Sequence, residues 1–150
     1  MYQNKLFTLN KIPVATHAEF LENIKLIEQN RYKKVWESGD SIPHQALKMI
    51  GASYLQQIYK LNSADIYYEF PFVGFEVDVI DKLLTHPIEC GDTNPLKLEH
   101  YLIANSVSDM VILPYPHQKN VYGYSFVHKA DFKKYILFKR DFLRQKIRSR

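Results

Sequence analysis

The stretch 65–116 decides the fold, and it opens with three short segments that alternate apolar and acidic residues. They read DIYYEFPF (65–72), FEVDVI (75–80) and PIECG (87–91). The two-residue period of this alternation is typical of strands, whose side chains point to opposite faces in turn. After Asp65 at the start of the first segment, the acids within the three segments are Glu69, Glu76, Asp78 and Glu89. Because a buried carboxylate is costly unless it is paired or binds a metal, a shared divalent cation is the simplest explanation.

The segments that follow and precede this stretch complete a small sheet with helices. Asn94-Pro95 predicts the start of a helix through Leu102, and the apolar run 109–113 predicts a fourth strand, parallel to the third through a right-handed crossover. The close spacing of the first three strands favours antiparallel neighbours. Upstream, Thr16 and Ser41 predict the caps of two amphipathic helices.

The two ends of the chain are less sharply patterned. The first sixteen residues indicate an extended arm or an edge strand, and 122–127 fit either a strand or a loop. Residues 130–150 predict a final amphipathic helix. The expected fold class is therefore α/β, with a small mixed central sheet flanked by helices, in a single domain spanning 1–150.

Composition excludes several classes of protein. A chain of 150 residues, 46% hydrophobic and 24% charged, has the size of one globular domain. Its single cysteine, Cys90, rules out intrachain disulfides and multi-cysteine metal sites, which favours a cytoplasmic location. No apolar run is long enough to cross a bilayer, so no membrane partner is expected. The net charge of +4 favours an acidic partner.

Common enzyme motifs are missing from the sequence. The six histidines are scattered without a His-x-x-x-His or His-Glu-x-x-His spacing, which argues against a zinc site. There is no Gly-x-Gly-x-x-Gly, no Walker Gly-Lys-Ser/Thr and no Gly-x-Ser-x-Gly. These absences argue against dinucleotide enzymes, NTPases and serine hydrolases.

The order of elements and the acidic strands resemble the PD-(D/E)xK nuclease superfamily, which has the restriction-endonuclease-like fold. FEVDVI (75–80) is similar to the family's Asp strand, and Ile88-Glu-Cys-Gly91 is similar to its (D/E)xK strand. The resemblance covers about 65–116. It implies that Asp78 and Glu89 bind Mg²⁺, or Mn²⁺ in its place, with the backbone carbonyl of Cys90 as a further ligand. Hard oxygen ligands of this kind suit Mg²⁺ independently of the resemblance.

The sequence departs from the family pattern at the lysine, because Gly91 stands where the family has Lys. Lys97 is the expected replacement. It falls in the first turn of the following helix, where the helix dipole disfavours a cation. Its other interpretation is an ordinary solvated lysine. If nothing replaces the family lysine, the protein would bind nucleic acid without cutting it.

Two further acids lie on the same strands. Glu76 shares a strand face with Asp78, and that face is either a metal-binding face with Glu76 as a catalytic candidate or a solvent-exposed one. Glu69 lies beside Pro71 near a strand end, so we expect it to be a neighbour of the site rather than a direct ligand.

Basic residues gather at the C-terminus, where eight Lys and Arg face a single acid between 133 and 150. Phosphate contact is a natural use for such a helical face, although cations also stabilise a helix C-terminus on their own. The expected contacts to nucleic acid are Lys133, Lys134, Arg140, Arg144 and Arg148.

Together these observations predict a metal-dependent nuclease that cuts DNA in preference to RNA. A homodimer would let two sites meet two strands, but nothing in the chain decides it. One alternative is a catalytically inactive nucleic-acid-binding or assembly protein of the same fold. Another is a protein-interaction module that uses the eleven tyrosines.

Overall fold

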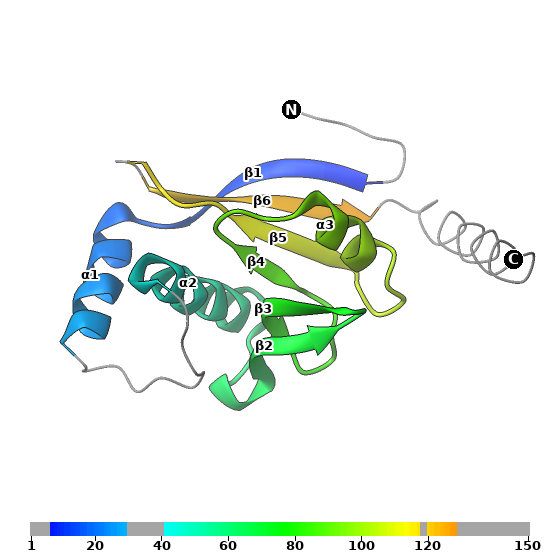
Figure 1. Ribbon diagram of the computed structural model, residues 1–150, viewed down its shortest axis with the longest axis horizontal. Coiled ribbons are helices and arrows are strands. Elements are labelled where there is room, and N and C mark those ends of the chain that lie inside the picture. Colours follow the sequence, from blue (N-terminus) through cyan, green and yellow to red (C-terminus); the bar gives the residue numbers. More distant parts are fainter. Residues whose placement is uncertain (1–6, 30–40, 118–119, 129–150) are drawn as a thin grey trace, which may run out of the picture.

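A six-stranded mixed sheet forms the centre of the molecule (Figure 1). The computed structural model describes residues 7–29, 41–117 and 120–128. The strands are β1 (Phe7–Ala15), β2 (Ile66–Phe72), β3 (Phe75–Asp81), β4 (Ile88–Cys90), β5 (Asp109–Leu113) and β6 (Val121–His128). They lie in the order β1-β6-β5-β4-β3-β2. This confirms the expected α/β class with a small mixed sheet.

The pairing of the strands follows from the lengths of their connections. β4 and β5 are parallel and are joined through a helix, whereas every other neighbouring pair is antiparallel. Val73 and Gly74 form the turn between β2 and β3, and both have positive φ, of 47° and 85°. Such a turn matches the twist of a hairpin, and Gly takes this conformation without strain. The predicted hairpin and crossover are both confirmed.

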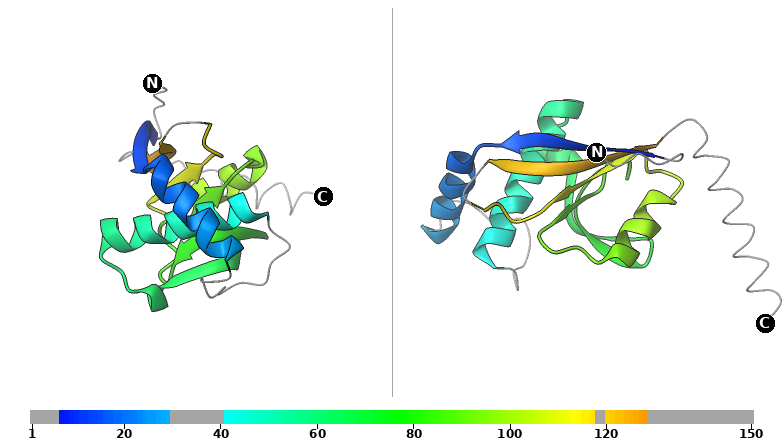
Figure 2. Two further views of the ribbon diagram at one scale, coloured as in Figure 1. Left: turned by 90° about the vertical axis from the view of Figure 1, so that its left-hand side faces the viewer. Right: turned by 90° about the horizontal axis from the view of Figure 1, so that it is seen from above.

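Helices cover both faces of the sheet. The helices α1 (His17–Glu28) and α2 (Ile42–Tyr59) pack together on one face, and α3 (Pro95–Leu102) lies apart from them (Figure 2). Adjacent sheet residues show the division, since Val79 packs in the core with α1 and α2 and Ile80 packs in the core with α3. Burial on two faces explains the apolar run 110–113 in β5, whose residues pack alternately in the two cores.

Each described helix begins at the residue that the sequence predicts. The side chain of Thr16 accepts a hydrogen bond from the backbone N–H of Glu19 at 3.0 Å. Ser41 caps α2 in the same way, and the side chain of Asn94 accepts from the N–H of Leu96 at 2.9 Å. These caps fix where α2 and α3 start, and both starts lie beside the site described below.

Two segments near the ends of the chain, for which the sequence allows two structures each, are both strands. The N-terminal arm forms the edge strand β1, and the segment around 122–127 is a strand, β6, that pairs with β1 and β5. The predicted final helix, 130–150, lies outside the described residues. Among the described helices, none has the length and apolar character needed to span a bilayer.

Candidate functional site

The site lies where β3 and β4 separate, and two carboxylates occupy the gap between them. Val79 and Ile88 are the paired residues of these strands. At the next position, the backbone N–H of Asp78 donates to Glu89 Oε2 at 2.9 Å, and the N–H of Cys90 donates to Asp78 Oδ2 at 2.8 Å. The carboxylates thus accept hydrogen bonds that backbone carbonyls accept in a regular antiparallel pair. The structure therefore brings Asp78 and Glu89 together, as the sequence predicts.

A lysine from α3 completes the pair. Lys97 forms an ion pair with Glu89 Oε1, and its side chain is 22% exposed while that of Glu89 is 3% exposed. Lys97 is in the first turn of α3, whose start is fixed by Asn94 and Pro95. The solvated-surface interpretation of Lys97 is therefore wrong, because its ammonium group reaches the buried acid.

The structure explains why position 91 is a glycine. Gly91 has a φ of +74°, and a Cβ atom built on it would lie 2.6 Å from Cζ of Tyr115. A side chain at position 91 would therefore need both a strained backbone and displacement of the tyrosine ring. The cation that contacts Glu89 comes instead from the next helix, as Lys97.

A histidine contacts Asp78, and a tyrosine contacts that histidine. His44, in the first turn of α2, places Nε2 3.2 Å from Asp78 Oδ1 and Nδ1 3.2 Å from the hydroxyl of Tyr115. Sequence reasoning missed both residues, since they lie 34 and 37 positions from Asp78 and belong to no motif. The signal that the sequence offers for His44 is its place in the first turn of a helix capped by Ser41. That turn contains no acid.

A second acid–base pair borders the site. Lys48, one helical turn after His44, is 1% exposed, and its Nζ lies 2.6 Å from Glu69 Oε1. The pairs that flank Glu69 in the β2–β3 register place it opposite Asp78, so Glu69, Asp78 and Glu89 form a row across three strands. Glu69 has a positive φ of 48°, which is unusual for a residue with a side chain. Glu69 is thus a neighbour of the pair, as expected.

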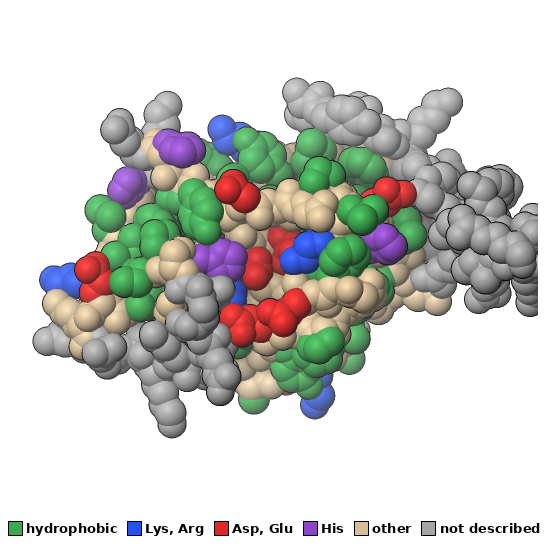
Figure 3. All heavy atoms as spheres, in the orientation of Figure 1, with side chains coloured by type: hydrophobic (Ala, Val, Ile, Leu, Met, Phe, Trp, Pro, Cys, Tyr) green, Lys and Arg blue, Asp and Glu red, His purple; other side chains and the backbone are tan. Residues whose placement is uncertain are grey.

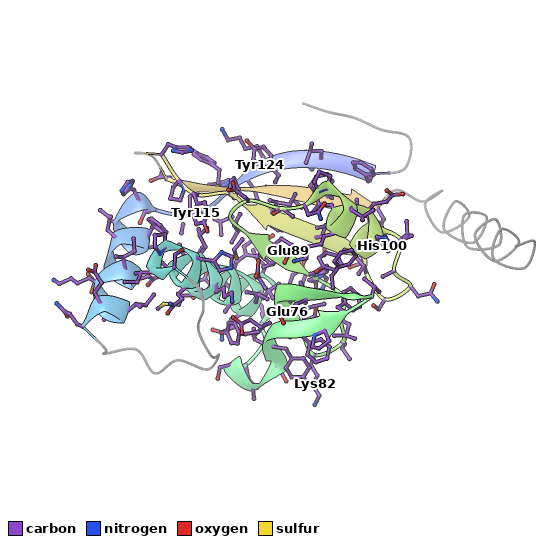
Figure 4. The ribbon with its side chains drawn as sticks, viewed as in Figure 1. Glu76, Lys82, Glu89, His100, Tyr115 and Tyr124 are labelled. Carbon is purple, nitrogen blue, oxygen red and sulfur yellow. The ribbon has the colours of Figure 1, made fainter. Side chains whose placement is uncertain are left out.

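Of the other predicted site residues, Glu76 lies apart from these contacts and Cys90 takes part through its backbone N–H. Glu76 is exposed and pairs in register with Pro71, near the end of the hairpin, and Figure 4 labels it on β3. Cys90 is buried with its side chain in the core beside α2, as expected from its alternation with Glu89. The five basic residues predicted to contact nucleic acid lie outside the described residues.

Burial and mutual repulsion set the charges of the two acids. Burial raises the pKa of Glu89, the charge of Asp78 raises it further, and the ion pair with Lys97 offsets only part, leaving a pKa of about 7. Burial also opposes ionisation of Asp78, but hydrogen bonds from His44 and Cys90 outweigh it and hold that pKa below its usual range. At neutral pH, Asp78 is ionised and Glu89 is poised between its two forms.

One buried hydroxyl close to the acids lacks a partner. Tyr101 is fully buried, and within the described part of the chain its hydroxyl makes no hydrogen bond. Burial raises its pKa above the usual range, and the charges of Glu89, Asp78 and Glu76 add to this rise. Figure 3 shows acidic, Lys and His side chains gathered over β3, β4 and the start of α3.

Other buried acids have structural explanations. Asp81 accepts hydrogen bonds from the backbone N–H groups of Thr85 and His86 and so closes the turn after β3. Asp109 pairs with His86 and accepts from the hydroxyl of Tyr59 at 2.6 Å. Asp78 and Glu89 differ from these acids because each is the other's neighbour.

The residues present fit a hard cation that keeps part of its water shell. Two carboxylates and a backbone carbonyl are enough for Mg²⁺, which takes only one or two carboxylates from the protein. Among residues 7–29, 41–117 and 120–128, no cluster of three or more His, Cys, Asp and Glu side chains is arranged to hold a metal. A site here would therefore rest on Asp78, Glu89 and the carbonyl of Cys90. The repulsion that raises the pKa of Glu89 is what a cation would relieve.

Comparison with known proteins adds no relative from which a role could be carried over. No protein-family model, no curated protein and no solved structure matches this chain.

Proposed function

We propose that the protein is a metal-dependent nuclease of the PD-(D/E)xK type, acting on DNA rather than RNA. The observation that carries the proposal is the cross-strand pair of Asp78 and Glu89 with Lys97 ion-paired to Glu89. Two acids and a lysine at one point of a mixed sheet are the groups that this chemistry requires. Here the lysine comes from α3 instead of β4.

Each group has a role that follows from its surroundings. Asp78 and Glu89 would hold Mg²⁺ with the carbonyl of Cys90. When bound, the ion would supply a Lewis acid and lower the pKa of a coordinated water. Lys97 would stabilise the charge that develops on the phosphate oxygens. His44 would orient Asp78 through the hydrogen bond from Nε2, and Tyr115 would fix the tautomer of His44 through Nδ1.

The charge of the chain supports nucleic acid as the partner. The net charge is +4, and the sequence of 133–150 contains eight basic residues and one acid. Beside the acids, Lys97 supplies positive charge on a side chain that is 22% exposed. A polyanion would gain from these contacts, and its affinity would fall as salt concentration rises.

Cleavage of plasmid and single-stranded DNA with Mg²⁺ or Mn²⁺ tests the proposal. We expect wild type to cut and Asp78→Ala and Glu89→Ala to lose activity. Lys97→Ala should lose about 100-fold or more, the scale of removing one group that stabilises developing charge. Glu22→Gln on exposed α1 and Lys82→Ala in the turn after β3 are matched controls. If the Asp78 and Glu89 variants cut as fast as wild type, or if wild type does not cut, the proposal is overturned.

A second candidate, nucleic-acid binding without cleavage, is favoured by one specific observation. Each of the four carboxylate oxygens of Asp78 and Glu89 already has a protein partner, so the pair is satisfied without a cation. In that case DNA binding would persist in EDTA and no divalent cation would produce cleavage. The cleavage assay run beside a binding assay therefore separates the two candidates.

A further inference from the structure

A pocket beside the acids is lined by flat, apolar groups. It has a volume of about 450 Å³ and is formed by Phe20 of α1, Ser41 and Pro43 at the start of α2, and Tyr115 and Pro116 after β5. Figure 4 shows Tyr115 on the side of the molecule where α1 and the start of α2 lie. The lining includes two aromatic rings, two proline rings and two hydroxyl groups, with no charged side chain among them.

This pocket shares a wall with the candidate site. The hydroxyl of Tyr115 lies 3.2 Å from Nδ1 of His44, whose Nε2 lies 3.2 Å from Asp78. The absence of a side chain at Gly91 lets the ring of Tyr115 lie directly against the end of β4, one residue after Cys90. A ligand in the pocket would therefore lie one side chain away from the acids.

We propose that this pocket binds an unpaired nucleobase of the strand whose phosphodiester lies at Asp78 and Glu89. The inference rests on the proposed function, which places the strand there, and it adds the substrate class. Flat aromatic and proline surfaces suit the face of any base, because base stacking does not depend on sequence. The hydroxyls of Ser41 and Tyr115 provide hydrogen-bonding groups at the wall of the pocket.

The consequence is a preference for single-stranded or locally unpaired nucleic acid. A base inside a duplex is stacked and paired with its neighbours and must leave the stack to enter a protein pocket. A substrate already unpaired next to the cutting site avoids that cost. Single strands, flaps and frayed ends are therefore the expected substrates, and continuous duplex is disfavoured.

The test uses oligonucleotides that carry the fluorescent base 2-aminopurine, in EDTA so that no strand is cut. Wild type should quench the fluorescence of an unpaired 2-aminopurine and bind single strand more tightly than duplex. Tyr115→Leu should weaken binding by roughly 5- to 150-fold, which corresponds to the loss of one base–aromatic stack. Tyr115→Phe keeps the ring and should retain quenching. Tyr124→Leu removes an exposed tyrosine on β6 and should bind like wild type. Circular dichroism spectra check that each variant is folded.

Several results would overturn the inference. Tyr115→Leu could bind the oligonucleotide as tightly as wild type, or Tyr124→Leu could lose as much affinity as Tyr115→Leu. Wild type could also bind duplex as tightly as single strand. If the pocket binds a protein in a Tyr115-dependent way and does not bind an oligonucleotide, its ligand is a protein partner and the inference is overturned as well. Metal-dependent cleavage that needs Asp78 but not Tyr115 would remove the pocket and leave the nuclease. Tyr115-dependent quenching without any cleavage would remove the nuclease and leave the pocket as a nucleic-acid-binding site.

Discussion

Replacing Glu89 by Gln should stabilise the protein at alkaline pH relative to acidic pH. The side chain of Glu89 is 3% exposed and lies beside the ionised Asp78. Burial and that neighbouring charge raise its pKa to about 7 in the folded chain. A carboxyl whose pKa is raised by folding favours the folded state while it is protonated. That stability is complete below the unfolded pKa and is lost as pH rises through the folded value.

The size of the effect follows from the two pKa values. A rise from 4.5 to about 7 corresponds to about 3 kcal/mol, since one pKa unit is worth about 1.4 kcal/mol. Most of this, about 2 to 3 kcal/mol, is lost between pH 5 and pH 8.5. Glu89→Gln carries no titrating group at this position and keeps an oxygen that can accept from the N–H of Asp78. Its free energy of unfolding, relative to wild type, should therefore improve by about 2 to 3 kcal/mol over the same interval.

Urea denaturation of both proteins at pH 5, 6, 7 and 8.5 measures this difference. All six histidines are present in both chains, so the comparison isolates the change at Glu89. Glu22→Gln, at an exposed position on α1, should show no such trend. A difference that stays constant with pH would refute the reasoning. So would a variant that becomes relatively less stable at high pH, because the ion pair with Lys97 would then outweigh burial.

Three other changes test how the site is held. Gly91→Ala should destabilise the fold by about 2 kcal/mol or more, from the positive φ and the contact with Tyr115, and Tyr115→Ala should relieve only the contact; thermal unfolding of the four chains in this double-mutant cycle separates the two causes. Tyr101→Phe should raise the free energy of unfolding by about 1 kcal/mol, because it removes a buried hydroxyl that has no partner among the described residues. A loss in urea denaturation would contradict this. Glu69→Met should cost more than Lys48→Met, because it removes a charged partner of a lysine that is 1% exposed, whereas the glutamate is 22% exposed. Equal losses in urea denaturation would argue against this asymmetry.

Much of the fold is predictable from local signals. The caps at Thr16, Ser41 and Asn94, the Val73-Gly74 turn and the period of two in β3 each act over a few residues. The parallel pairing of β4 and β5 follows from the helix between them. The position of β6 between β1 and β5 was left open, because pairing between segments more than a hundred residues apart leaves no local pattern.

The contacts of the candidate site, like the fold, are only partly predictable from the sequence. Asp78 and Glu89 share a hairpin-like pair of strands, so their meeting follows from register, and Lys97 follows within one turn of the next helix. His44 contacts Asp78, and Tyr115 contacts His44, only because α2 packs across the sheet with its start beside the end of β5. No spacing in the sequence encodes that packing.

The most direct test of the central claim is a crystal of the full chain soaked in Mn²⁺, with anomalous density measured at the manganese edge. The account predicts one peak in contact with carboxylate oxygens of both Asp78 and Glu89. A peak elsewhere, or none at a saturating concentration of Mn²⁺, would contradict it.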